Sequence, residues 1–142
     1  MPSTRRAAMR NSVLIAGALL GFLSVVVGAS AEHVLQPRVT DEVFRWVMTA
    51  IRYHQVGALV VTAIGLVLFA PLTAVRAARL RRSAWVFVLG TLLFSFSIYF
   101  AALTGIDKLT WATPVGGTTL MVAWLLLAWA AWPVADEPRR DA

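Results

Sequence analysis

Long apolar runs separated by short polar links dominate the pattern of this chain. Four stretches carry no Asp, Glu, Lys or Arg, namely Asn11–Ala31, Tyr53–Val75, Ser83–Ile106 and Leu109–Ala135. An α-helix needs roughly 20 residues to cross the hydrocarbon of a bilayer, and these stretches hold 21, 23, 24 and 27. The pattern predicts four membrane-spanning helices, at residues 12–31, 54–75, 84–104 and 113–132.

Composition narrows the class of protein further. Of the 142 residues, 59% are hydrophobic and 14% are charged, whereas soluble domains carry about 25% charged residues. This balance excludes a soluble enzyme and a disordered chain, and the absence of cysteine excludes a disulfide framework and a thiolate site. We expect an all-α fold, an integral membrane four-helix bundle that forms a single membrane domain over residues 1–142.

The distribution of Lys and Arg predicts the orientation of the spans. Nine of these residues fall at the N-terminus, in the second link and at the C-terminus: Arg5, Arg6, Arg10, Arg76, Arg79, Arg81, Arg82, Arg139 and Arg140. The first and third links carry four, which are Arg38, Arg45, Arg52 and Lys108. Because cytoplasmic segments are enriched in positive charge, we expect cytoplasmic tails at 1–11 and 133–142 in a cell (inner) membrane.

The first apolar run has a second interpretation. Its arginines, its apolar centre and the small residues Ala29, Ser30 and Ala31 resemble a signal peptide with a cleavage site. Cleavage would leave three spans, and the intact mass of the purified protein decides between the two.

The first link has an amphipathic pattern. Thr40 can cap a helix, Asp41 and Glu42 would occupy its first turn, and apolar residues recur at helical spacing up to Ile51. An interfacial amphipathic helical segment between spans one and two fits this pattern. The outer end of a long second helix fits it equally well.

The remaining local signals concern turns and helix packing. Gly105 can adopt positive φ in the third link, and Thr113 with Pro114 predicts a cap and the start of the fourth helix. Small and hydroxyl residues allow helices to approach closely in lipid. We expect packing contacts at Gly17, Gly21, Gly28, Ser95, Ser97, Gly116 and Gly117.

Most unusual polar residues are predicted near one face of the membrane. They are Glu32, His33, Arg52, Tyr53, His54, Gln55, Tyr99, Thr104 and Asp107. Polar groups at the edge of hydrocarbon need partners, so a hydrogen-bonded cluster and a Glu32–Arg52 ion pair are expected. The cluster could also bind a lipid, quinone or small-molecule headgroup. The two histidines and Glu32 lack a metal-ligand spacing, so we expect no metal site.

The sequence offers no catalytic motif. The seven acidic residues lie at span ends or in links, and this placement of the spans leaves no ionisable side chain near the middle of the membrane. Proton-coupled transport is therefore disfavoured. Hydrolase and phosphate-binding motifs are also absent. We expect no catalytic residues, no cofactor and no nucleic-acid partner.

Several motifs together resemble the YgdD-like family of small membrane proteins, a domain of unknown function. They include Arg52-Tyr-His-Gln55, Leu93-Phe-Ser-Phe-Ser97-Ile-Tyr99 and Thr113-Pro-Val-Gly-Gly117. The resemblance implies a four-helix inner-membrane protein with an uncleaved first span and no established reaction. Gly57 stands where the family often has a second histidine, so a site built on that histidine does not carry over.

These observations favour a non-enzymatic accessory or structural membrane protein. It would pack with membrane lipids, with itself or with a membrane-protein partner. The alternative is a lipid, quinone or small-molecule binding or transport protein that uses the polar cluster.

Overall fold

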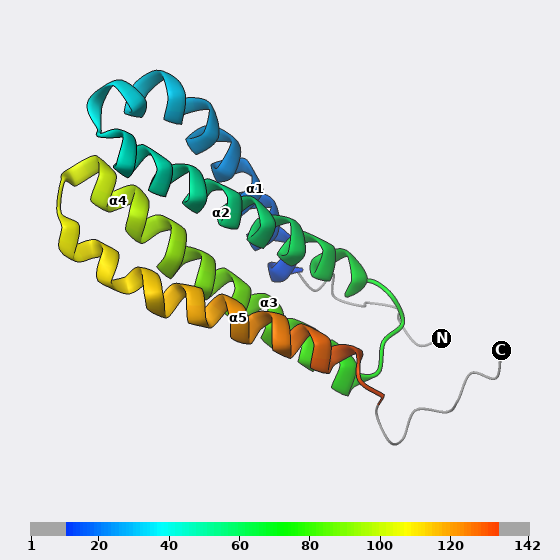
Figure 1. The fold of residues 1–142 in the computed structure, drawn as a ribbon. Coiled ribbons are helices and arrows are strands. Elements are labelled where there is room, and N and C mark those ends of the chain that lie inside the picture. Colours follow the sequence, from blue (N-terminus) through cyan, green and yellow to red (C-terminus); the bar gives the residue numbers. More distant parts are fainter. Residues whose placement is uncertain (1–10, 134–142) are drawn as a thin grey trace.

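The computed structural model describes residues 11–133, and these residues form helices joined by short turns (Figure 1). Four helical rods are long and apolar enough to cross a membrane: Ser12–Arg38, Asp41–Val67, Ala74–Thr104 and Asp107–Ala131. The predicted all-helical, four-span fold is confirmed. The arginines of the tails, Arg5, Arg6, Arg10, Arg139 and Arg140, lie outside the described residues.

The first and third rods each contain a π-helical turn. The first rod is α1 (Ser12–Ser30), the π-helical turn η1 (Ala31–Leu35) and the short 3-10 helix η2 (Gln36–Arg38). The third is α3 (Ala74–Thr91), the π-helical turn η3 (Leu92–Phe96) and α4 (Ser97–Thr104). Such turns leave an extra residue in the helix and often occur at functional sites.

The second rod is one continuous helix, α2 (Asp41–Val67). Thr40 caps it, because its hydroxyl accepts a hydrogen bond of 3.3 Å from the Val43 amide. The amphipathic segment after the first link is therefore the beginning of a long helix and not a separate interfacial one. The helix also ends eight residues before the expected position 75, because residues 68–73 form the turn that contains Pro71.

The fourth rod begins with the 3-10 helix η4 (Asp107–Trp111) and continues as α5 (Ala112–Ala131). Gly105, at φ 69°, ends α4 in the left-handed conformation, as the sequence predicts. The predicted cap at Thr113 is wrong: the residue before α5 is Trp111, and it provides no side-chain cap. Thr113 instead forms a hydrogen bond of 2.8 Å with Ser97.

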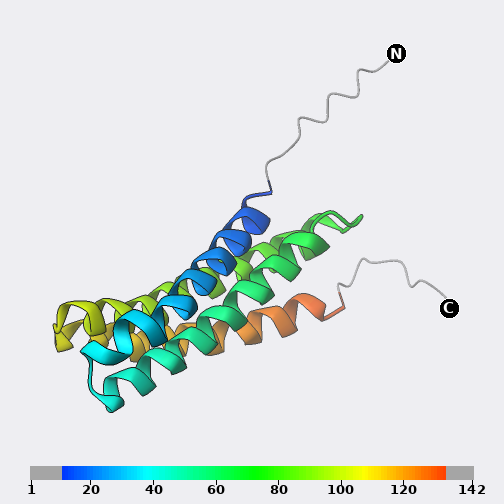
Figure 2. The ribbon, with the colours of Figure 1, turned by 90° about the horizontal axis from the view of Figure 1, so that it is seen from above.

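Two helix pairs make up the bundle. The closest packing joins α1 to α2 and α3 to α5, and α2 meets the third rod between them (Figures 1 and 2). Arg79 ties α3 to the last turn of α5, since its guanidinium donates to the carbonyls of Trp129 and Trp132 at 3.3 Å and lies 4.2 Å from the Trp129 ring. Helix C-termini favour such cationic donors.

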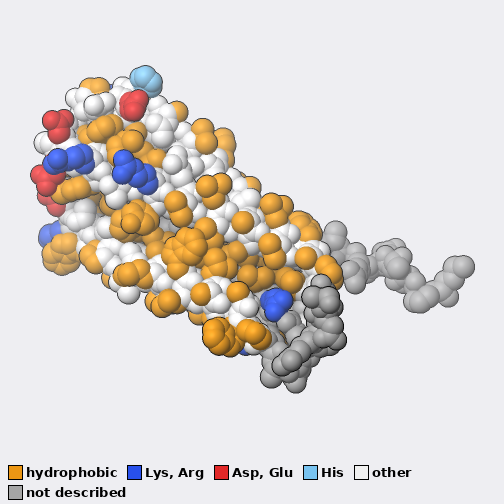
Figure 3. Space-filling model, turned by 45° about the vertical axis from the view of Figure 1, so that its right-hand side comes forward, with side chains coloured by type: hydrophobic (Ala, Val, Ile, Leu, Met, Phe, Trp, Pro, Cys, Tyr) orange, Lys and Arg blue, Asp and Glu red, His pale blue; other side chains and the backbone are white. Residues whose placement is uncertain are grey.

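The charged residues of the described chain are concentrated at the two ends. Glu32, Arg38, Asp41 and Lys108 belong to the end opposite Ser12 and Ala131, which we call the distal end. On the face shown in Figure 3 the visible acidic side chains and most of the visible basic ones gather there, while hydrophobic side chains cover much of the flank. A flank of this kind suits hydrocarbon and not water.

Candidate functional site

A line of buried polar side chains crosses the interface between α2 and the third rod. We call His54, Thr91, Ser95 and Tyr99 the polar seam. Nδ1 of His54 and the hydroxyl of Tyr99 share a hydrogen bond of 3.3 Å, and Ser95 donates to the Ala50 carbonyl at 2.8 Å. The rings of His54 and Phe96 lie 5.3 Å apart. The seam therefore joins two helices by hydrogen bonds in a region that lipid surrounds.

His54 occupies the middle of its helix. It lies thirteen positions after Asp41 and thirteen before Val67, about 20 Å from each at 1.5 Å per residue. Its side chain is completely buried. His54 is therefore a buried ionisable side chain in the middle of a candidate span, whereas the sequence analysis placed it at the start of one. That placement followed from starting the second span at residue 54 instead of residue 41.

The nine residues expected to cluster do not converge on one site. Glu32 and His33 are exposed on η1, and Arg52, Tyr53 and Gln55 are exposed on α2. Asp107 is exposed on η4, and the Thr104 hydroxyl donates to the Phe100 carbonyl at 2.6 Å. Of the nine, the structure joins only His54 and Tyr99 by a hydrogen bond.

The side chains that could bind a metal ion are also dispersed over the described part of the chain. Between residues 11 and 133, no ion pair links Glu32 to Arg52, and no group of three His, Asp or Glu side chains could hold a metal ion. The described residues therefore offer no metal-binding arrangement from which to argue chemistry.

The glycines expected at helix contacts have different surroundings. A methyl group at Gly17 would lie 2.6 Å from the Thr62 backbone nitrogen, and one at Gly116 would overlap the Phe94 backbone. At Gly117 it would meet only the Phe94 ring, at 3.7 Å, and at Gly21 and Gly28 it would meet nothing within 4 Å. Gly17 and Gly116 are thus places where two backbones touch.

Ser97 joins the third rod to α5. Its hydroxyl donates to the Phe94 carbonyl at 2.9 Å and forms a hydrogen bond of 2.8 Å with the Thr113 hydroxyl. Close to it, the π-helical turn η3 carries both Phe94, which faces Gly116, and Ser95, which faces α2. This one turn therefore contacts helices on two sides.

Three contact residues escaped the sequence analysis. They are Gly57, Gly65 and Thr91. Thr91 is buried, and its hydroxyl oxygen faces Gly57. A methyl group added at Gly65 would lie 2.6 Å from the Leu14 Cα. His54, Gly57 and Gly65 recur at spacings of three and eight residues, which place them near one face of a helix. That small and polar face was the available signal.

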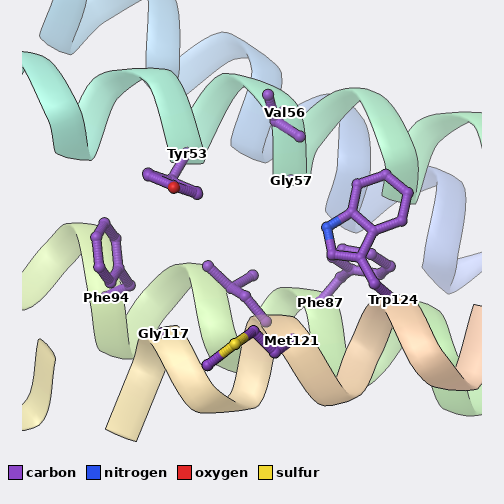
Figure 4. A pocket seen from close by; sticks show the side chains of 9 residues that line it. Tyr53, Val56, Gly57, Phe87, Phe94, Gly117, Met121 and Trp124 are labelled. Carbon is purple, nitrogen blue, oxygen red and sulfur yellow. The ribbon is translucent and has the colours of Figure 1, made fainter. Parts of the chain in front are cut away.

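An apolar lateral groove lies between α2 and α5 (Figure 4). Its volume is about 230 Å³, and it is lined by Tyr53, Val56, Gly57, Phe87, Phe94, Gly117, Leu120, Met121 and Trp124. Tyr53 packs edge-on against Phe94 at 4.9 Å, and Phe87 packs edge-on against Trp124 at 5.0 Å. Two aromatic pairs therefore border the groove: one joins α2 to η3 and the other joins α3 to α5.

Comparison with known proteins identifies related sequences. Residues 27–117 match the family described as "Protein of unknown function (DUF423)". The chain is 34% identical over 124 residues to a UPF0382 membrane protein of Haemophilus influenzae, covering 87% of this chain and 96% of that protein. It is 31% identical over 121 residues to the UPF0382 inner membrane protein YgdD of Escherichia coli, covering 81% and 85%. No solved structure matches the chain.

Proposed function

The chain belongs to the DUF423 family of membrane proteins of unknown function, and we propose that it acts without catalysis, as an accessory or structural protein of the inner membrane. Its role would depend on the molecules that it contacts in the bilayer. The partners we propose are membrane lipids in the first place. A second copy or a membrane-protein subunit would be the other kind of partner.

The observation that carries this proposal is the way the buried hydroxyl groups are used. Ser83 donates to the Ala123 carbonyl at 3.0 Å, Ser95 to the Ala50 carbonyl, and Ser97 bonds to Thr113. Each of these bonds joins two helices of the same chain. These three serine hydroxyls are thus committed to holding the bundle together, while Nε2 of His54 and the Thr91 hydroxyl have no hydrogen-bond partner within the described residues.

The lateral groove is where we propose that lipid packs. Its walls are apolar and it lies on the lipid-facing flank, so hydrocarbon must fill it in a bilayer. A volume of about 230 Å³ is below the roughly 300–1,000 Å³ of typical small-molecule sites. A helix, about 10 Å across with its side chains, is also too wide to enter. An acyl chain is the occupant that fits.

We further propose that both termini face the cytoplasm. Arg76, Arg79, Arg81 and Arg82 lie in α3 at the same end as the start of α1 and the end of α5 (Figure 1). This arginine cluster favours the cytoplasmic side. Because the chain has no cysteine, single cysteines introduced at Ser12 and at Asp107 can be labelled from outside intact cells. Labelling of Asp107→Cys alone is expected, and labelling of Ser12→Cys would contradict the orientation.

Extraction in native nanodiscs tests the function. We expect the purified protein to retain phospholipid and to leave that lipid chemically unchanged. An added Cβ at Gly117 would meet only the Phe94 ring, so Gly117→Leu should place its side chain in the groove and retain less lipid. Thr118→Leu, on the exposed side of α5, should behave like the wild type. Chemical turnover of a bound molecule would contradict the proposal, and so would equal lipid retention by Gly117→Leu and the wild type.

A further inference from the structure

A second lateral cavity opens near the distal end, between the first rod and α4. Its volume is about 180 Å³. The walls are mostly aliphatic, with an arginine and a tyrosine among them; the lining includes Val26, Val34, Leu35, Arg38, Tyr99 and Leu103. We call it the distal pocket. It is separate from the lateral groove, which lies between α2 and α5 and shares none of these residues.

From this cavity we infer a binding site for one anionic phospholipid, with the phosphate on Arg38 and an acyl chain in the distal pocket. The inference rests on the proposed role of lipids as partners and names the lipid class and the residues. Nothing in the related proteins' descriptions assigns such a site.

The shape of the distal pocket selects a slender ligand. Its lining on the first rod runs from Val26 to Arg38, between three and four helical turns at about 3.6 residues per turn. A volume of about 180 Å³ spread over that length leaves a narrow slot. A ring-bearing headgroup is too wide for it, whereas an extended acyl chain runs along it.

The charge at the rim selects the headgroup. Arg38 is the last residue of η2 and of the first rod, at the distal end, and the ends of membrane-spanning helices lie near the level of lipid phosphates. Among the residues that line the distal pocket, Arg38 is the one that carries a charge. Guanidinium donors match phosphate oxygens in pairs. Glu32 and His33 are exposed on the neighbouring turn η1 and do not line the cavity, so the rim keeps its positive character.

Tyr99 contributes a buried aromatic wall to the distal pocket. Its side chain is 7% exposed, and its hydroxyl is already bonded to His54. The ring therefore offers an apolar wall and no free donor to the ligand. The ligand meets a charged group only at Arg38, because the Ser30 hydroxyl in the lining already donates to the Val26 carbonyl at 2.8 Å.

Native mass spectrometry of the full-length protein in mild detergent tests this inference. The probes are phosphatidylglycerol and phosphatidylcholine with the same acyl chains. We expect phosphatidylglycerol to bind more tightly to the wild type. Arg38→Gln should weaken that binding about fivefold, as expected for one basic residue at an anionic lipid surface, and should leave phosphatidylcholine unchanged.

Matched variants make the result specific to the pocket. Val26→Trp fills the cavity and should reduce binding of both lipids, while Val25→Trp, which points away from the cavity and is 67% exposed, should not. Arg45→Gln removes an exposed arginine near the same end that does not line the pocket, and it should bind like the wild type. Arg38 is itself exposed, so Arg38→Gln reports on binding even where Val26→Trp lowers the melting temperature.

Three results would overturn the inference: equal binding of the two lipids, an equal loss in Arg45→Gln and Arg38→Gln, or full binding in a folded Val26→Trp. Lipid retention that still depends on Gly117 would leave the proposed function standing in each case. Loss of all retained lipid from the wild type would remove both proposals.

Discussion

Besides packing against α1, helix α2 faces two further neighbours in two different ways. Toward the third rod the interface is closed, with Ser95 bonded to the Ala50 carbonyl and His54 bonded to Tyr99. Toward α5 the interface is open and forms the lateral groove, although its walls are apolar and aromatic. In a soluble protein the apolar side would be the one to close, because water would drive it together.

The difference shows that lipid is the solvent of this bundle. Lipid tails are as apolar as leucine, so burying apolar side chains against each other gains little in a bilayer. Close backbone contact at small residues and hydrogen bonds between helices supply the stability instead. Toward the third rod, α2 has the hydrogen bonds, and toward α1 it has the close backbone contacts; the open side has neither. Variants that add or remove these features on one side at a time test that account.

The largest effect is expected at the contact between α1 and α2. Gly17→Val would force two backbones apart, because Thr62 lies against this glycine, and we expect a loss of about 3 kcal/mol in the free energy of unfolding. Gly21→Val is the control on the same helix, since a side chain there meets nothing within 4 Å. Unfolding in mixed detergent micelles measures both. Equal losses would show that backbone contact is not what holds α1.

A smaller effect is expected for one methyl group on α5. Gly116→Ala pushes against the Phe94 backbone, whereas Gly117→Ala meets only the flexible edge of the Phe94 ring. The first change should cost about 2 kcal/mol and the second should cost nothing measurable. Melting temperatures of the two variants provide the comparison. A costly Gly117→Ala would place the groove among the closed interfaces.

The sequence predicted the architecture well because charge is excluded from hydrocarbon. The four uncharged stretches gave the number of helices, and the Thr40 cap was correct. The sequence left the start of α2 open, since its first turns carry Asp41, Glu42 and Arg45, which resemble a link. The expected span began at residue 54, and this choice moved His54 from the middle of a helix to its end.

The candidate site was less predictable, because spacing identifies a helix face but not its neighbour. Gly17 and Gly21 form one small-residue motif, yet only Gly17 faces α2. The distal pocket depends on how the π-helical turn η1 and α4 lie against each other. No local pattern in the sequence encodes such a contact between distant segments.

The His54–Tyr99 pair gives the next effect in size. Tyr99→Phe leaves Nδ1 of the buried imidazole without its partner, and we expect a loss of about 1 kcal/mol. Adding His54→Leu removes the imidazole as well and should restore part of the stability. A double-mutant cycle on unfolding free energies measures the coupling. Purely additive losses would mean that the two side chains do not depend on each other.

The most direct test compares Ser95→Ala with Met121→Ala in the same unfolding measurement in mixed micelles. Ser95→Ala removes a single oxygen from the polar seam, and the account predicts a loss of about 0.6 kcal/mol, the average for a hydrogen bond between membrane helices. Met121→Ala removes most of a large apolar side chain that is 62% exposed on the groove, and no loss is predicted because lipid replaces it. A stable Ser95→Ala together with a destabilised Met121→Ala would contradict the account.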